Sequence, residues 1–257
     1  LFFVKYKLTC QLCHSSPANL WKSLNGEKTK MGKSAIILVS GGLDSVTTAY
    51  YVKKKLKYDK LLFLFFDYGQ RTLKQEEYCC REIAKLLKAD FKKIDLKWLG
   101  EISTAMLNSN EEMPKVDEKE LGNVDKGNKE ILNYWVPCRN AVFLINALAH
   151  AESFVLNKKE KPDVYIGLKC EGRIPMKDTT PEFVKAVNKL ADEATHDGGY
   201  NVLAPLIDKD KDEIVKIAAE LKVPFELTYS CYSGGKFKGK IPIHCGKCEN
   251  CMQRKKG

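Results

Sequence analysis

Residues 35–48 read AIILVSGGLDSVTT, and this stretch decides the fold. Ala35–Ser40 is a continuous apolar run of strand length, and a helical pattern follows the glycines from Asp44 to Leu56. Glycine permits a tight turn between a strand and a helix, and the free N–H groups at a helix N-terminus attract phosphate. The stretch therefore predicts a buried strand, a phosphate-binding loop and a helix.

The loop itself, SGGLDS at residues 40–45, offers side chains as well as backbone N–H groups. The hydroxyl groups of Ser40, Ser45 and Thr47 suit phosphate oxygens, and Asp44 is placed to hold Mg²⁺ or a bridging water. The simpler alternative is a glycine turn with an Asp or Ser helix cap, which the complete strand–loop–helix pattern disfavours. The predicted nucleotide-binding residues are Leu38, Val39, Ser40, Gly41, Gly42, Leu43, Asp44, Ser45, Val46, Thr47 and Thr48.

Beyond this unit the sequence continues to alternate strand and helix patterns. Further strands are expected at Lys60–Phe66, Phe91–Leu96, Asp163–Leu168 and Asn201–Ile207. Helices are expected at Lys74–Lys88, Arg139–Leu156, Pro181–Thr195 and Asp210–Leu221, the last with a capping pair of Asp210 and Glu213. Such alternation predicts an α/β fold with a mostly parallel, doubly wound sheet covered by helices on both faces.

The domain organisation follows from where this alternation begins and ends. Residues 1–30 lack it and are interpreted as an extension of unclear role, whereas residues 31–225 form the expected α/β domain with the phosphate-binding loop. The polar, charged stretch Asn108–Asn133 is expected to be a mobile flap or insertion. Residues 226–257 are expected to form a metal-binding segment packed on the same domain.

Composition narrows the class of protein. The 257 residues include 43 Lys and Arg against 33 Asp and Glu, a net charge of +10. This excess is either a footprint for a polyanion or a solvated, lysine-rich surface. Apolar runs stay far below the roughly 20 residues of a membrane-spanning helix, so a membrane protein is not expected. Ten cysteines without a secretory signal favour ligands or packing over disulfides, and a cytoplasmic location.

Four of the cysteines predict a metal site. Cys231 is followed by Cys245, Cys248 and Cys251 with two residues between successive members of the triplet. Four thiolates suit a closed, tetrahedral Zn²⁺ site of structural type, with an iron–sulfur cluster as the alternative. His244 is expected to be a neighbour and not a ligand. Two other groups, the pair Cys10 and Cys13 and the pair Cys79 and Cys80, are interpreted as free thiols and packing residues.

The SGGLDS loop resembles the PP-loop of ATP pyrophosphatases, which cleave ATP between the α and β phosphates. Several other segments resemble one branch, the 7-cyano-7-deazaguanine synthases, over about Ala35 to Cys251. These segments are DYGQR at 67–71, VPCRN at 136–140, IG at 166–167, DTTPEF at 178–183 and SCY at 230–232. One departure is Cys138, where the family usually has glycine.

This resemblance implies a two-stage conversion of a carboxylate to a nitrile. The carboxylate of 7-carboxy-7-deazaguanine would be adenylated by ATP with Mg²⁺, ammonia would form the amide, and a second adenylation would lead to the nitrile. The resemblance also implies a homodimer, ammonia from solution or a separate protein, and no need for nucleic acid. Implied catalytic residues are Asp44, Ser45, Arg71 and Arg139, and implied substrate-binding residues are Arg71, Arg139, Asn140, Lys177 and Asp178.

The sequence also allows simpler structural roles for some of these residues and other functions for the chain. Asn140 could cap a helix, and Lys177 with Asp178 could be a solvated turn pair. A related enzyme could adenylate another acceptor, in tRNA thiolation or carboxylate–amine ligation, with Cys138 as the one thiol placed to take part. From a different class, the chain could be an inactive zinc-ribbon nucleic-acid-binding module, supported by the basic stretch at 254–256.

Overall fold

The computed structural model describes residues 32–115, 132–158, 160–170 and 176–256. Predictions for residues 1–30, including Cys10 and Cys13, and for most of the stretch 108–133 lie outside the described residues. Lys33–Gly257 form one compact unit. All elements below belong to that unit.

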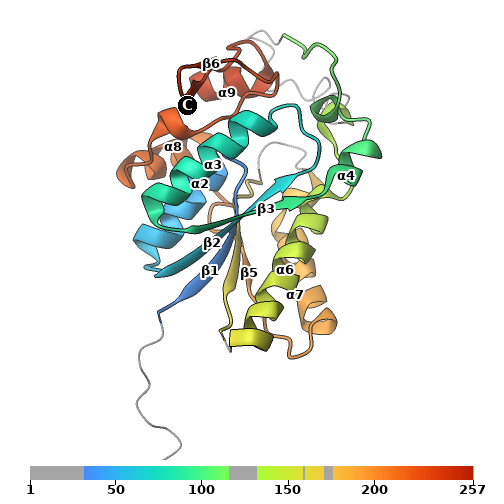
Figure 1. Cartoon of the computed structure of the whole chain (residues 1–257), viewed down its shortest axis with the longest axis vertical. Helices are drawn as coiled ribbons and strands as arrows, with labels where there is room; N and C mark the ends of the chain where they lie inside the picture. Colours follow the sequence, from blue (N-terminus) through green and yellow to red (C-terminus); the bar gives the residue numbers. More distant parts are fainter. Residues whose placement is uncertain (1–31, 116–131, 159, 171–175, 257) are drawn as a thin grey trace, which may run out of the picture. The chain divides into compact units, whose positions relative to one another are not determined.

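A five-stranded parallel sheet forms the centre of this unit (Figure 1). Its strands lie in the order β3 (Asp90–Asp95), β2 (Lys60–Asp67), β1 (Ser34–Leu38), β4 (Asp163–Ile166) and β5 (Val202–Leu203). All four neighbouring pairs are parallel. The predicted doubly wound sheet is confirmed, with β1 between β2 and β4. After β1 the chain first adds β2 and β3 on one side of it, and later adds β4 and β5 on the other side. Doubly wound folds bind ligands at such a change of direction, here at the carboxyl ends of β1 and β4.

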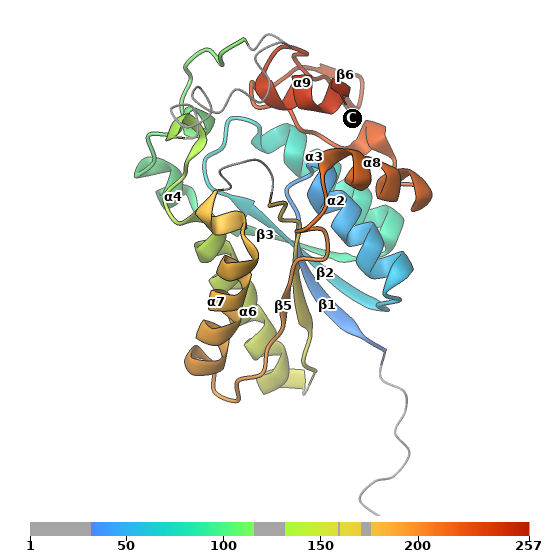
Figure 2. The ribbon, with the colours of Figure 1, turned by 180° about the vertical axis from the view of Figure 1, so that it is seen from behind.

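Alternation along β1 divides the core into two layers. Ile36 and Leu38 face one layer, with α6 (Arg139–Lys158) and α7 (Pro181–Ala194). Ala35, Ile37 and Val39 face the other layer. That layer holds α2 (Leu43–Tyr50), α3 (Leu73–Leu87) and α8 (Lys211–Glu220). Figures 1 and 2 show the two helix groups on opposite faces of the sheet. Burial on both faces explains why the strands are continuous apolar runs.

Two predicted elements differ clearly in their bounds, and one predicted helix cap is present. The helix expected at Asp44–Leu56 is α-helical only to Tyr50, and its last turn, η1 (Tyr51–Lys55), is π-helical. The strand expected at Asn201–Ile207 pairs only over Val202–Leu203, because the chain then turns with Ile207 N–H donating to Ala204 O at 3.2 Å. The predicted capping box of α8 is present, with Asp210 and Glu213 each bonded to the other's backbone N–H.

Short elements connect this frame. They are α4 (Lys97–Glu101), η2 (Met106–Asn108), η4 (Lys177–Thr179), η5 (Phe225–Leu227), the antiparallel pair β6 (Phe237–Lys238) and β7 (Ile241–Pro242), and α9 (Glu249–Lys256). The C-terminal elements pack on α3, where Cys79 joins Tyr229, Cys231, Cys248 and Cys251 in one buried cluster. Among the described helices, each is too short or too polar to cross a membrane.

Candidate functional site

The loop after β1 is shaped by two glycines that have different roles. Gly41 has a φ of +73°, and a Cβ at this position would lie 2.8 Å from the carbonyl oxygen of Glu76. Gly42 is the N-cap of α2, and the cap has no side-chain hydrogen bond. The first N–H groups of a helix have no partner within the helix. The loop therefore brings the N-terminus of α2 to the carboxyl end of β1 with its N–H groups uncapped by side chains, as an anion site requires.

The predicted nucleotide-binding residues divide into those that face the loop and those that support it. Ser45 Oγ lies 3.2 Å from Ser40 Oγ and donates to Gly42 O at 3.0 Å, so these two hydroxyl groups brace the turn. The hydroxyl groups of Thr47 and Thr48 donate to the backbone of α2. Leu38, Val39, Leu43 and Val46 lie in the core. Backbone N–H groups, Ser40 and Asp44 are thus the features left to meet a nucleotide.

Asp44 is held by a lysine that the sequence analysis did not select. Lys211 Nζ lies 2.7 Å from Asp44 Oδ1, and both side chains are largely shielded from solvent. Lys211 is the first residue of α8, directly after the N-cap Asp210. The capping box predicted where this helix begins, but not that its beginning lies beside the phosphate loop. The pairing across 167 residues of sequence depends on the tertiary fold.

The end of β4 packs directly against the start of α2. A Cβ at Gly167 would lie 2.7 Å from the Cα of Ser45 and 2.8 Å from its nitrogen. Only glycine permits this approach, which explains the Ile166-Gly167 motif. The segment after β4 therefore runs along the phosphate loop at the point where the sheet changes direction.

A second group of residues surrounds Arg139 and is called the Arg139 cluster. Its members are Tyr68, Arg139, Asn140, Asp178 and Tyr232. Arg139, the first residue of α6, lies over the ring of Tyr68 with 5.6 Å between the guanidinium carbon and the ring centroid. Burial acts to lower the pKa of Arg139, but Tyr68, Tyr232 and Asp178 together raise it. Burial also raises the pKa of both tyrosines to about 12. The cluster is a desolvated cation among aromatic rings.

Asp178 brings an acceptor into this cluster. Its Oδ1 is buried without a hydrogen-bond partner among the described residues. Burial raises its pKa, and the nearby Arg139 opposes that rise. Asn140 Nδ2 donates to the backbone oxygen of Asp178 at 3.2 Å, so it ties η4 to α6. Lys177 in the same turn is exposed. The structure therefore brings Arg139, Asn140 and Asp178 together and leaves Lys177 at the surface.

Arg71 lies in a different setting from Arg139. Its Nη1 donates to the backbone oxygen of Glu111 at 2.5 Å, and its backbone N–H donates to Leu107. Gly234, in the cysteine-bearing segment, packs against its backbone oxygen. The described contacts of Arg71 are thus to η2 and to loops, and none of them joins it to Asp44 or Arg139.

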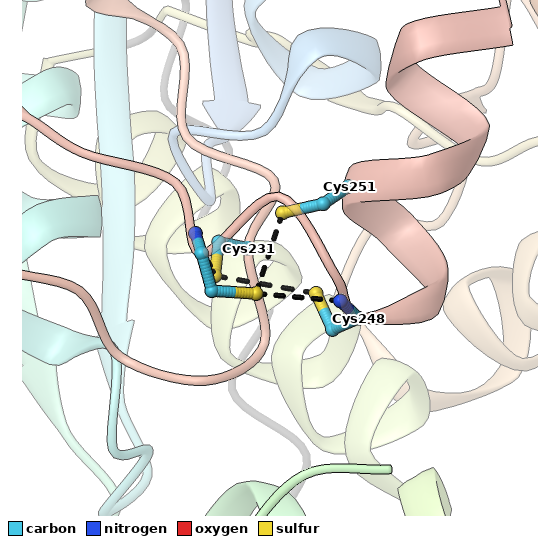
Figure 3. A group of neighbouring side chains, drawn as sticks. Cys231, Cys248 and Cys251 are labelled. Atoms are coloured by element: carbon cyan, nitrogen blue, oxygen red, sulfur yellow. Dashed lines mark hydrogen bonds between the residues drawn. The ribbon is translucent and has the colours of Figure 1, made fainter. Parts of the chain in front are cut away.

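The four predicted ligand cysteines come together. The sulfur atoms of Cys231, Cys245, Cys248 and Cys251 all lie within 4.8 Å of one another. Figure 3 shows the labelled Cys231, Cys248 and Cys251 with their sulfur atoms turned toward a common centre. The pairs Cys245–Cys251 and Cys231–Cys248 are 3.8 and 4.0 Å apart. A tetrahedron with metal–sulfur bonds of about 2.3 Å has edges of about 3.8 Å, so this donor set fits a metal such as zinc.

Neighbouring groups support the cysteine site. Backbone N–H groups of Cys245, Lys247 and Cys248 donate to ligand sulfur atoms at 3.3–3.4 Å, which stabilises thiolates. His244 points elsewhere, because its Nε2 accepts from Ser230 N–H at 3.1 Å. This agrees with its prediction as a neighbour. Tyr229, two residues before Cys231, donates its backbone N–H to Gly41 O at 2.7 Å. The cysteine site therefore braces the phosphate loop.

Comparison with known proteins agrees with this geometry. The family described as "Queuosine biosynthesis protein QueC" matches residues 34–257. A 7-cyano-7-deazaguanine synthase from Methanobrevibacter smithii is 37% identical over 227 residues, covering 88% of this chain and 93% of that protein. The 7-cyano-7-deazaguanine synthase from Pyrococcus furiosus is 35% identical over 235 residues, covering 88% and 92%.

A solved structure is more distant. The U34-tRNA thiolase NcsA from Methanococcus maripaludis with its 4Fe-4S cluster gives a TM-score of 0.43 at 17% identity. That likeness covers 80% of this chain and 63% of the thiolase. The family match and the two synthases confirm the resemblance stated for the sequence: the chain belongs to the QueC family of queuosine biosynthesis proteins.

Proposed function

We propose that this protein converts 7-carboxy-7-deazaguanine and ammonia to 7-cyano-7-deazaguanine at the expense of ATP, which it cleaves to AMP and pyrophosphate. Support comes from family membership and from one observation in particular. The buried Asp178 Oδ1 has no hydrogen-bond partner among the described residues, and it lies near the partly buried cation of Arg139. An unpaired buried acceptor costs about 1–3 kcal/mol, so its presence favours a ligand that supplies N–H donors.

The proposed substrate matches the Arg139 cluster in shape and charge. Deazaguanine is flat and carries N–H donors on its pyrimidine edge, and its carboxylate is an anion. Asp178 would accept from the donor edge, while the rings of Tyr68 and Tyr232 offer flat apolar surfaces. Arg139 would bind the carboxylate, since a guanidinium fork matches its two oxygens. Arg71 would be a second arginine that binds the substrate carboxylate or the α-phosphate.

The first chemical stage is transfer of AMP. A carboxylate oxygen attacks the α-phosphorus, the bond to the β-bridging oxygen breaks, and pyrophosphate leaves with the electron pair. Backbone N–H groups of residues 41–45 and the hydroxyl group of Ser40 would hold the phosphates during this step, while the Ser45 hydroxyl group braces the turn. When bound, Mg²⁺ supplies positive charge against the phosphate oxygens, and Asp44 is the residue that would hold it.

The second stage repeats this activation on an amide. Ammonia attacks the acyl carbon, AMP leaves and a proton is lost, which gives the amide. The amide oxygen then attacks the α-phosphorus of a second ATP, and pyrophosphate leaves. Loss of AMP and the remaining N–H protons from the adenylated imidate leaves the nitrile. Nothing in this sequence of steps requires nucleic acid. The same adenylation machinery serves both stages, which makes the enzyme a carbon–nitrogen ligase.

The cysteine site completes the proposal. We propose Zn²⁺ as its metal, because four thiolates close the tetrahedron and leave no position for water. Its task is then structural: it fixes the segment that carries Tyr229 and Tyr232. We further propose residues 31–225 as the ATP-binding domain and 226–257 as its metal-binding segment. Reduced thiols and ATP favour the cytoplasm as the place of action, and a homodimer as the working form is carried over from the family resemblance.

Incubation with ATP, Mg²⁺, ammonium and 7-carboxy-7-deazaguanine tests the function. We expect two AMP per nitrile formed, the product being identified by its mass. Omitting ammonium should leave the acyl-adenylate and stop before the amide. ADP instead of AMP, or AMP release that does not depend on the deazaguanine, would contradict the proposal.

A further inference from the structure

Arg254 begins the basic stretch 254–256, which the proposed function does not use. It lies on α9, and its neighbour Lys255 is exposed. The guanidinium group of Arg254 is instead bonded inside the fold, where it donates to three oxygens of the segment 225–230. Arg254 therefore joins α9 to that segment and does not belong to a free basic surface.

The guanidinium fork holds the segment 225–230 at three points. Its Nη1 donates to Thr228 Oγ1 at 2.8 Å and to Ser230 Oγ at 3.4 Å, and its Nη2 donates to Phe225 O at 2.8 Å. Thr228 is fully buried, and its hydroxyl group also donates to Phe225 O at 2.7 Å. A planar guanidinium offers its donors in a rigid fork, which a flexible ammonium group does not. The three bonds therefore fix the course of the backbone through this segment.

Tyr229 lies between the two residues whose hydroxyl groups accept from Arg254. Its backbone N–H donates to Gly41 O at 2.7 Å, the contact that braces the phosphate loop. Its side chain is buried, and its hydroxyl oxygen accepts from Gly235 N–H at 2.7 Å. Two residues after it comes Cys231, one of the four cysteines that meet. Tyr229 is thus anchored from both sides, by the guanidinium group of Arg254 and by the cysteine site.

We propose that Arg254 is a positioning residue for ATP binding, which acts on the phosphate loop through Tyr229. The inference rests on the proposed function for its ligand, ATP. Without the three bonds the segment is free to shift, and the hydrogen bond to Gly41 O shifts with it. The N–H groups of the loop then no longer point at the phosphates. A misplacement of about 1 Å costs about a hundredfold in rate, so even a small shift is measurable.

The test measures ATP affinity by calorimetry and metal content by mass spectrometry on the same samples. For Arg254→Met we expect ATP affinity to fall about tenfold, the factor that a hydrogen bond to a charged group accounts for, with the metal retained. KM for the deazaguanine should not change, because the cysteine site separates this segment from the Arg139 cluster. A general loss of stability would affect both substrates alike.

Lys255→Met is the matched control for the basic stretch. Lys255 is exposed, and its Nζ donates to Gly246 O at 3.0 Å, away from the segment 225–230. This variant also loses one positive charge, so it controls for the change in net charge. It should bind ATP as the wild type does.

Thr228→Val tests the same bond from its other end. Valine keeps the size of the side chain and removes the hydroxyl group that accepts from Arg254. We expect ATP affinity to fall about two- to tenfold, the range for one hydrogen bond. Added to Arg254→Met it should cause no further loss of ATP affinity, because both changes break one bond, whereas independent effects would add. Arg254→Lys can keep one of the bonds and should lie between Arg254→Met and the wild type.

Wild-type ATP affinity in Arg254→Met would overturn the inference. A loss of ATP affinity that is matched by loss of metal, or by an equal rise in KM for the deazaguanine, would overturn it too. If Arg254→Met does not fold, Thr228→Val decides in its place, and unchanged ATP affinity there has the same meaning.

The two proposals fail separately. A protein that forms the nitrile while Arg254→Met binds ATP normally contradicts only the positioning role. A protein whose ATP affinity depends on Arg254, but which releases no AMP with the deazaguanine, contradicts only the function.

Discussion

The phosphate loop and the Arg139 cluster differ in the groups that they offer to a ligand. The loop is continuous in sequence, and most of its side chains are buried or bonded to their own helix. It acts mainly through backbone N–H groups. The Arg139 cluster draws on the end of β2, the start of α6, η4 and the segment after Cys231. It acts through side chains whose burial changes their pKa values.

This difference teaches where each region is vulnerable. A backbone site depends on the shape of the chain, so an added methyl group at a glycine is enough to damage it. A side-chain site depends on particular atoms, so an isosteric change damages it without disturbing the fold. The cysteine segment contributes to both, because Tyr229 contacts Gly41 and Tyr232 lies near Arg139. Four predictions separate these dependences.

The largest effect is expected from Cys248→Ser, which should weaken both regions together. Structural zinc sites in small peptides contribute about 10–16 kcal/mol, so losing one ligand should lower Tm by more than about 10 °C. Metal content by mass spectrometry and the rate of AMP formation should both collapse. Cys79→Ala is the matched control, since Cys79 is buried in the same cluster but is not one of the four ligands. A metal content that survives in Cys248→Ser would contradict the site.

Gly41→Ala should damage the loop alone. Its Cβ would lie 2.8 Å from a backbone oxygen, and a misplacement of about 1 Å costs about a hundredfold in rate. AMP formation should fall by at least that factor. Gly239→Ala is matched in conformation, with a φ of +61°, but a Cβ there meets nothing within 4 Å. Gly239→Ala should lose only about 1 kcal/mol of stability and keep its rate of AMP formation. Equal rates of AMP formation in Gly41→Ala and Gly239→Ala would show that crowding at residue 41 does not damage the loop.

Asp178→Asn should affect the Arg139 cluster and spare the loop. The amide keeps the shape of the side chain but loses the charge and can present N–H where Oδ1 now stands. We expect KM for the deazaguanine to rise about ten- to a hundredfold, with ATP affinity measured by calorimetry unchanged. Asp197→Asn, at an exposed carboxylate bonded to His196, is the control. A change in ATP affinity equal to the change in KM would mean that the two regions are not independent.

The smallest effect is expected at Cys138, the residue before Arg139. It has a φ of +52°, where a side chain is strained and glycine is not. Cys138→Gly should therefore stabilise the protein by up to about 1 kcal/mol, seen as a rise of a few degrees in Tm. Activity should be retained, since the thiol has no part in the proposed chemistry. Loss of nitrile formation in this variant would revive a catalytic role for the thiol.

The sequence predicted those features whose residues lie close together along the chain, and missed those whose residues meet only in the folded structure. The strand–loop–helix unit, the parallel sheet and the four cysteines are each encoded by local spacing, and the structure confirms the fold and the meeting of the cysteines. The Asp44–Lys211 pair joins residues 167 positions apart, and no local pattern predicts it. The end of β5 was missed because its apolar residues continue after the chain has turned away.

The Arg139 cluster shows the same limit of prediction from sequence. Arg139, Asn140 and Asp178 were selected through a resemblance, and the structure brings them together. The tyrosines around them belong to motifs that were quoted for that resemblance but carried no assigned role. Aromatic residues near strand ends are usually core, and only packing distinguishes those that surround a cation.

The hydrogen bond from Tyr229 to Gly41 joins a late part of the chain to an early part, so the phosphate loop is complete only after the C-terminal segment has been made. The phosphate loop is translated early, whereas its brace and the cysteines that fix the brace are translated late. A nascent chain on the ribosome therefore carries the phosphate loop before it carries the backbone N–H of Tyr229 that braces it.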